Sequence, residues 1–266
     1  MSRRRALVRK ELLDASRNPG ALVPVVVVAL VSLFLPFLIA VIIPAVTGEP
    51  LADDPDMVKV SAGVGGGFGS EFGTEARIQF FLFQQFLLLF LLLPITGAMA
   101  IAAHSIVGEK QARTLEALLA TPITTFELLI AKLLGALLPT LAISAAGVVL
   151  YLVGVALFAE PGVMRAMLSA RTAIVLGVLG PASALVSLQL ALLVSSRSND
   201  ARTAQQFGVL IILPLTGLVV AQLIGSVSLS PSTIALVGVA LFGLWILLML
   251  ISVALFERET ILTRWK

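Results

Sequence analysis

The chain has 266 residues, of which 59% are hydrophobic and only 12% are charged. A soluble domain carries about a quarter charged residues, so this composition excludes an ordinary soluble protein. The net charge is +3, without a basic patch interleaved with aromatic residues, which disfavours nucleic-acid binding. The absence of cysteine excludes disulfides and thiol chemistry. We expect an all-α integral membrane protein with one transmembrane domain, residues 1–266.

Residues 1–20 are predicted to form a helix that precedes the first membrane span. Val8, Leu12 and Ala15 recur at i, i+4 and i+7, with basic residues over much of the remaining surface. This pattern favours an interfacial helix that contacts membrane lipid at the level of the headgroups. A plain basic anchor would give a similar sequence, and the pattern leaves both interpretations open.

Charge-free stretches long enough to cross a bilayer predict six spans, since a spanning helix needs roughly 20 apolar residues. The last stretch, 203–256, is long enough for two spans and is broken by the sequence GSVSLSPS. The predicted spans are about 21–45, 78–105, 125–158, 172–195, 203–225 and 232–256. The first exceeds the hydrophobic region of a signal peptide and lacks a cleavage site, so we expect it to be retained.

The distribution of Lys and Arg predicts the orientation of the spans. Fourteen of these residues flank the spans on the side of the N-terminus, and four lie on the other side. By the positive-inside rule, both termini then face the cytoplasm.

The outer loop between the first two spans contains the sequence SAGVGGGFGSEFG, residues 61–73. A phosphate-binding loop needs Gly-Lys-Ser/Thr, and this loop has no lysine. We expect a flexible or interfacial external loop, whose role the sequence does not reveal.

Polar residues within the spans are candidates for the lining of a translocation pathway. They are Gln84, Gln85, Ser183, Ser187, Gln189 and Gln222. Hydrogen bonds between helices are the commoner use of such residues, and this alternative stays open. No acidic or basic residue lies mid-membrane, which argues against an ion-coupled transporter and against a dedicated site for a highly charged cargo.

His104 and Ser105 invite a catalytic interpretation, which we disfavour. Adjacent residues on a helix project about 100° apart, and the chain has no second histidine to act as a base. We expect His104 to be a polar residue at the inner end of the second span.

The segment between the second and third spans, GEKQARTLEALLATPIT, is the most sharply defined in the chain. Leu115, Leu118 and Leu119 fall on one face of a short helix. Thr121 precedes Pro122 and ends that helix. Thr124 and Glu127 fit a capping box, and Ile123 and Leu128 a hydrophobic staple, at the start of the third span.

The charges of this segment favour docking to a protein. Lys110, Arg113 and Lys132 are balanced by Glu109, Glu116 and Glu127. A lipid anchor would be dominated by Lys and Arg, whereas a mixed-charge helix with a leucine face suits a protein partner. The alternative is a solvated turn between helices.

The sequence GEKQARTLEALLATPITTFELLIAKLL, with RKELLDASRNPGAL near the N-terminus, resembles the type-2 family of ATP-binding-cassette (ABC) exporter permeases. In that family the segment E-x-x-x-G-T-L-E-x-L-L-x-T-P-I contacts a separate ATPase subunit. The matching residues are Glu109, Thr114, Leu115, Glu116, Leu118, Leu119, Thr121, Pro122, Ile123 and, further on, Lys132. Arg113 stands where glycine is usual, and it favours helix more strongly.

The resemblance implies a short cytoplasmic coupling helix and a bundle of six spans. It implies a permease in a bacterial inner membrane that pairs with a second copy and with two cytoplasmic ABC ATPase subunits. ATP and Mg would be held by those partners, because this chain has no phosphate loop or cofactor site and is not itself an enzyme. The small-residue stripe Gly217, Ala221 and Gly225 suits close helix packing and would form the dimer contact.

The cargo stays open, as does the choice between a homodimer and a heterodimer. An amphipathic or hydrophobic substrate is the leading expectation. The alternatives are a subunit that transmits mechanical work for assembly or maturation of an extracytoplasmic protein, and a membrane-embedded enzyme.

Overall fold

The computed structural model describes residues 3–16, 19–63, 72–111, 124–197, 206, 213, 214, 217 and 230–255. Every element in these ranges is a helix, as predicted. The α-helices are α1 (Arg3–Ser16), α2 (Pro19–Phe37), α3 (Ile43–Thr47), α4 (Pro55–Gly63), α5 (Thr74–Leu87), α6 (Leu92–Gln111), α8 (Thr125–Phe158), α9 (Val163–Met167), α10 (Ala170–Ile174), α11 (Gly180–Arg197) and α14 (Pro231–Leu255). Two short segments between them are π-helical, η1 (Leu38–Ile42) and η4 (Val175–Leu179). Two others are 3-10 helices, η2 (Leu51–Asp53) and η3 (Leu88–Leu91).

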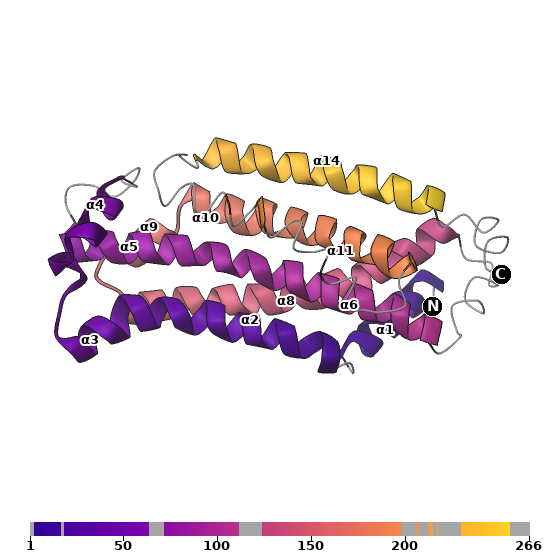
Figure 1. Ribbon diagram of the computed structural model, residues 1–266, viewed down its shortest axis with the longest axis horizontal. Coiled ribbons are helices and arrows are strands. Elements are labelled where there is room, and N and C mark those ends of the chain that lie inside the picture. Colours follow the sequence, from indigo (N-terminus) through magenta and orange to yellow (C-terminus); the bar gives the residue numbers. More distant parts are fainter. Residues whose placement is uncertain are drawn as a thin grey trace.

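Five helices are long and apolar enough to cross a membrane, and they run side by side in Figure 1. They are Leu22–Thr47, Thr74–Glu109, Phe126–Phe158, Ala170–Ser195 and Pro231–Val253. These agree with the first four and the last of the predicted spans. The remaining predicted span, 203–225, lies outside the described residues except for 206, 213, 214 and 217.

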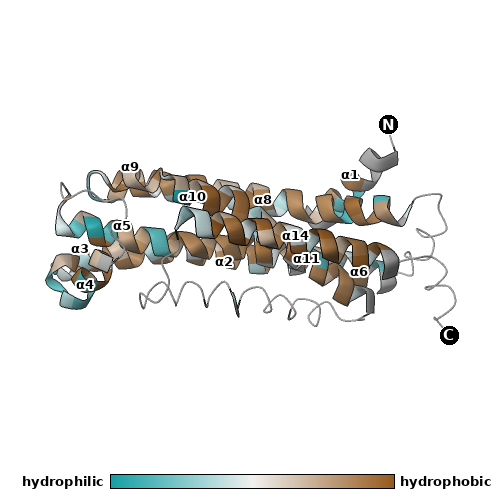
Figure 2. Ribbon diagram, turned by 90° about the horizontal axis from the view of Figure 1, so that it is seen from above, coloured by the Kyte–Doolittle hydropathy of each residue, from teal (hydrophilic) through white to brown (hydrophobic). Residues whose placement is uncertain are grey.

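The second span forms the centre of the described bundle. In its most apolar stretch 78% of the residues are buried, against 17%, 11% and 17% in the corresponding stretches of the first, third and last spans. Helices that are hydrophobic all round suit a lipid environment, which replaces the polar surface of a soluble protein. Figure 2 shows hydrophobic residues along the bundle and hydrophilic ones gathered near its ends, around α4 and α1.

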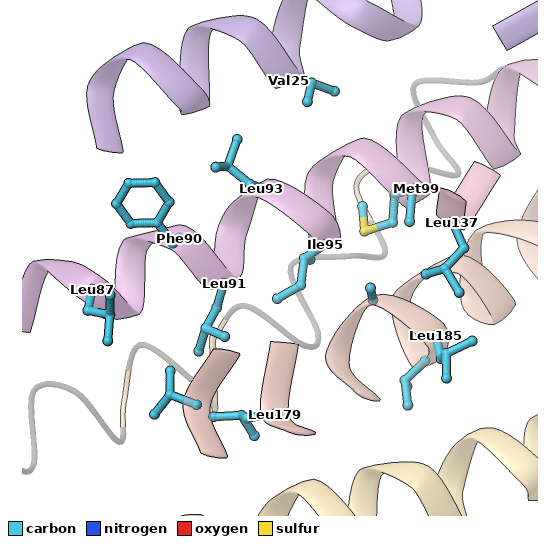
Figure 3. Packing of buried hydrophobic residues seen from close by; sticks show 14 of the residues in the cluster. Val25, Leu87, Phe90, Leu91, Leu93, Ile95, Met99, Leu137, Leu179 and Leu185 are labelled. Carbon is cyan, nitrogen blue, oxygen red and sulfur yellow. The ribbon is translucent and has the colours of Figure 1, made fainter. Parts of the chain in front are cut away.

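The second span packs between the first and the fourth. In Figure 3, Leu93 points toward the helix that carries Val25, while Leu91 and Ile95 point toward the fourth span, where Leu179 lies. All five side chains are buried. This span therefore contacts neighbours on two sides.

Gly97 lets the first three spans approach one another. A Cβ atom there would lie 2.5 Å from Thr140 Cγ2 and 3.2 Å from Val25 Cγ2. The contact with Thr140 is closer than Cβ atoms come in proteins, and that with Val25 is unusually tight, so a larger residue would push the Thr140 side chain, and with it α8, away.

Tyr151 anchors the end of α8 nearer Phe158. Its ring is fully buried, with the rings of Phe37, Phe83 and Phe90 at centroid distances of 5.6, 5.9 and 4.9 Å. Its hydroxyl donates to the carbonyl of Phe83 at 2.8 Å. The burial of a phenol is thus combined with a satisfied hydroxyl, which fixes α8 against α2 and α5.

Three of the spans are irregular rather than continuous α-helix. The second contains the 3-10 segment η3, and the first and fourth contain the π segments η1 and η4. Pro94 lies in the first turn of α6, where the missing N–H is not needed, so the sequence favours a new helix start there. Ser32 of the first span donates to the carbonyl of Leu89 within η3, at 3.4 Å.

Polar contacts organise the end of the bundle that carries α3, α4 and α9. Glu75 accepts hydrogen bonds from the backbone N–H groups of Leu51 and Ala52, at 3.3 and 2.9 Å. Of the predicted loop 61–73, Ser61 to Gly63 complete α4, while residues 64–71 lie outside the described residues. The role of this loop stays a prediction.

Candidate functional site

A cluster of charged residues is buried where α1 lies against the last turns of α6 and the first turns of α8. Figure 1 shows these three helices meeting at one end of the bundle. The cluster, here called the ion cluster, consists of Lys10 and Glu11 of α1, Ser105 and Glu109 of α6, and Lys132 of α8.

Lys132 is the centre of the ion cluster. Its Nζ lies 2.7 Å from Glu109 Oε2 and 3.3 Å from Glu11 Oε1, and it donates to Ser105 Oγ at 2.8 Å. Lys132 is 3% exposed, Glu11 5% and Glu109 8%. Charges this deeply buried are tolerated only when they are paired and hydrogen-bonded, and here both conditions hold.

Ser105 and Lys10 complete the pairing. The hydroxyl of Ser105 donates to Glu11 Oε2 at 2.8 Å. Lys10 approaches from the rim, with Nζ 2.5 Å from Glu109 Oε1 and a side chain that is 42% exposed. Two carboxylates therefore face two ammonium groups, and the cluster has no net charge.

The pKa values of the two α1 residues reflect this pairing. Burial alone would raise the pKa of Glu11, but the charge of Lys132, the hydrogen bond from Ser105 and the charge of Lys10 outweigh it and lower that pKa. Burial alone would lower the pKa of Lys10, but the hydrogen bond and charge of Glu109, with smaller contributions from Glu11 and Asp14, raise it. Both residues are thus held in their charged forms.

Sequence spacing explains how the helices bring these groups together. Ser105 and Glu109 are separated by four residues, so they share one face of α6. On α8, Gly135 allows α1 to approach closely, because a Cβ atom there would overlap the Cβ of Glu11. The carboxylate of Glu11 can then reach Lys132, one turn earlier on α8.

The start of α8 is fixed by the predicted capping box, which is confirmed. Thr124 Oγ1 accepts from the N–H of Glu127 at 3.2 Å, and Glu127 Oε2 accepts from the N–H of Thr124 at 3.3 Å. Such a box satisfies two backbone donors that would otherwise lack partners. The predicted staple stays a prediction, because Ile123 lies outside the described residues.

The ion cluster joins the two helix ends that flank the candidate coupling segment. These ends, of α6 and α8, are here called the stem of the segment. Glu109 precedes residues 112–123 and Lys132 follows them, so their contact holds the two flanking helices together. Of the predicted coupling residues, the structure places Glu109. The others lie outside the described residues, namely Arg113, Thr114, Leu115, Glu116, Leu118, Leu119, Thr121 and Pro122.

Among the predicted pathway residues, three make hydrogen bonds within the bundle. Gln84 donates to Thr172 at 3.0 Å, Ser187 to the carbonyl of Ser183 at 2.7 Å, and Gln189 to Ser252 at 2.5 Å. The bonds of Gln84 and Gln189 join different helices, which is the commoner use of polar residues in spans.

The other polar candidates differ from these three. The amide of Gln85 and the hydroxyl of Ser183 are buried without a hydrogen-bond partner among the residues that the structure describes. Gln222 lies outside the described residues, as do Ala221 and Gly225 of the predicted dimer contact. Gly217 is described and is exposed.

Sequence reasoning did not select Glu11, Lys10 or Gly135, and it considered Ser105 only beside His104. One signal was available, since Glu11 is an acidic residue in a strongly basic helix. Within the described residues no group of three or more His, Asp or Glu is placed to bind a metal. The carboxylates of the ion cluster are matched by lysines instead.

Comparisons with known proteins agree with the membrane bundle. A family model described as "ABC-2 family transporter protein" matches residues 5–260. A comparison with curated proteins gave no match. The family model covers nearly the whole chain, including most of α1, all five described spans and the ion cluster. The chain therefore belongs to the ABC-2 transporter family.

Proposed function

We propose that this chain is the permease subunit of an ABC exporter, working as a homodimer driven by two separate cytoplasmic ATPase subunits. Membership of the ABC-2 transporter family supports a permease of this class. The ion cluster is the observation that carries the mechanism, because it links α1, the second span and the third span at the candidate coupling segment.

The ATPase partners bind ATP and Mg, and the segment from Glu109 to Pro122 docks to them. Its leucine face and balanced charges suit a protein surface. Closure of the ATPases displaces the segment. The displacement is transmitted to the second and third spans through the stem, the ends of α6 and α8.

The ion cluster keeps this stem stiff. If the stem opened, Lys132 would leave Glu109 and Glu11, and buried charges would lose their partners. Separating buried charges that are paired and hydrogen-bonded is unfavourable unless water replaces the lost partners. Displacement of the segment therefore moves α1, α6 and α8 together, instead of bending the connection between α6 and α8.

The spans then rock to expose the cargo to the other side of the membrane. Both termini face the cytoplasm of a bacterial cell, in keeping with the distribution of Lys and Arg. The cargo is an amphipathic or hydrophobic molecule, since the charge-free stretches of the spans offer no partner for a strongly charged one.

The coupling assignment is tested with the double variant Glu116→Arg, Leu118→Asp, expressed together with the ABC ATPase partner. Loss of one interface anchor commonly costs about 2 kcal/mol, or roughly 30-fold in affinity. We expect co-purification of the ATPase and its activity in the complex to fall by at least that factor. The matched control is Asp53→Arg, a charge reversal on an exposed residue near α4.

Unchanged co-purification and activity in the double variant would show that the coupling assignment is wrong. A vesicle assay then tests transport itself. A complex that hydrolyses ATP, responds to these substitutions and moves no amphiphile would instead act by transmitting mechanical work to an extracytoplasmic protein.

A further inference from the structure

Gln85, in the second span, carries a buried amide whose hydrogen-bonding capacity is unused. The side chain is 8% exposed, and neither Nε2 nor Oε1 has a hydrogen-bond partner among the described residues. Leaving a buried polar group unsatisfied costs about 1–3 kcal/mol. A leucine would fill the same place without that cost, so packing of this conformation does not explain the glutamine.

The preceding residue shows what a structural glutamine looks like in the same turn. Gln84 is also buried, at 3% exposure, but its Nε2 donates to the hydroxyl of Thr172 in α10 at 3.0 Å. In the sequence alone the two adjacent glutamines are indistinguishable. The structure separates them into one that joins two helices and one that has no such role.

Gln85 lies at a joint in the second span. Its carbonyl accepts from the N–H of Leu88, at the junction where α5 gives way to the 3-10 segment η3. In the fourth span, the π segment η4 packs against η3. Irregular segments inside long helices often mark hinges or functional sites, since their backbone hydrogen bonds are easier to rearrange.

We propose that Gln85 is a cargo-contact residue, whose amide binds the uncharged, hydrogen-bonding head group of an amphiphilic substrate when the second span rearranges at η3. The proposal rests on the exporter function proposed above and narrows its substrate class.

The chemistry of the two spans selects an uncharged head group. Residues 78–108 and 172–196 contain no Asp, Glu, Lys or Arg, so a charged group passing between them would find no opposite charge. A primary amide offers two donors and one acceptor, which suits a molecule that has both kinds of group. Hydroxyl and amide groups meet this requirement, whereas sulfate and quaternary ammonium groups do not.

The experiment uses three amphiphiles with the same twelve-carbon tail, below their micellar concentrations: dodecyl maltoside, dodecyl sulfate and dodecyltrimethylammonium. The complex with its ATPase is reconstituted in nanodiscs, and stimulation of ATP hydrolysis is measured for each. We expect the maltoside to stimulate the wild-type complex most strongly. In Gln85→Leu its half-maximal concentration should rise at least tenfold, while Tyr151→Phe, which removes a hydrogen bond from α8 to α5 and leaves the fourth span untouched, keeps the wild-type value.

Thermal unfolding gives a second readout, on the permease alone and without amphiphile. Gln85→Leu should raise the unfolding temperature, because it removes an unsatisfied buried amide. Gln84→Leu should lower it, because the hydrogen bond between α5 and Thr172 is lost. A structural role for Gln85 predicts the opposite, a fall in unfolding temperature for Gln85→Leu.

Three results would overturn the proposal: a wild-type response of Gln85→Leu to the maltoside, equal stimulation by all three amphiphiles, or destabilisation by Gln85→Leu. If the proposed exporter function itself is wrong, a different result is expected, because no ATPase would co-purify with the permease. The maltoside would then still raise the unfolding temperature of the wild-type permease more than that of Gln85→Leu, if the contact exists.

Discussion

Replacing Lys132 with methionine tests whether the ion cluster stabilises the protein. The substitution keeps an unbranched side chain of similar length and removes the ammonium group that lies 2.7 Å from Glu109 and 3.3 Å from Glu11. Two buried carboxylates then lose their central partner. Such a loss costs about 3–5 kcal/mol. We expect the lower end, about 3 kcal/mol, because Lys10 stays within 2.5 Å of Glu109 and 3.4 Å of Glu11.

The free energy of unfolding can be measured by titrating the purified permease with SDS in mixed micelles. Lys59→Met is the matched control, since Lys59 pairs with Asp56 at 3.6 Å and both side chains are largely exposed. An exposed pair contributes about 0–1 kcal/mol, so this variant should be close to wild type.

A double-mutant cycle with Glu11→Gln separates pairing from packing. If Glu11 and Lys132 interact directly, the double variant should be less destabilised than the sum of the single variants by about 0.5–3 kcal/mol. A loss below about 1 kcal/mol for Lys132→Met, or strict additivity in the cycle, would refute the role assigned to the ion cluster.

Three further predictions concern single residues. Gly135→Ala should weaken the docking of α1, lower stability by about 1–3 kcal/mol and increase proteolysis within α1, whereas Gly108→Ala, with open space around it, should be neutral or slightly stabilising. The pKa of Glu11 is lower in the folded protein than its unfolded-state pKa of 4.5, so the charged carboxylate stabilises the fold. This stabilisation is complete above the unfolded-state pKa and is lost as the pH falls through the folded-state pKa. Stability measured between about pH 5 and 3 should therefore fall more steeply in the wild type than in Glu11→Gln, and equal slopes would contradict this. Tyr151→Phe should cost about 1 kcal/mol in SDS titrations, because the carbonyl of Phe83 loses its donor, and no loss would show that the bond contributes little.

The described spans could be predicted from the sequence because lipid imposes a simple requirement. A helix that crosses a bilayer must be apolar over about 20 residues, whatever its neighbours are. The start of α8 was predictable for a related reason, since Thr124 and Glu127 satisfy local backbone groups and need no tertiary contact.

The ion cluster could not be predicted in the same way. Glu11 is an ordinary charged residue in sequence, and its burial depends on Gly135 and Lys132 in a helix that begins more than a hundred residues later. Lys132 was counted among the charges of the coupling segment and matched in a family motif, but its partners were not predicted. The difference between Gln84 and Gln85 also depends on tertiary structure, because it follows from the position of Thr172 in α10.

The docking of α1 also constrains how the chain is made. Glu11 bonds to Ser105 and Lys132, which follow it by 94 and 121 residues. At about 5–20 residues per second, Lys132 is synthesised roughly 6–24 s after Glu11. During that interval the first two spans are synthesised and the third has only begun, while the carboxylate of Glu11 stays in water. The seating of α1 is therefore a late step of biogenesis, which reports that the second and third spans have been inserted side by side.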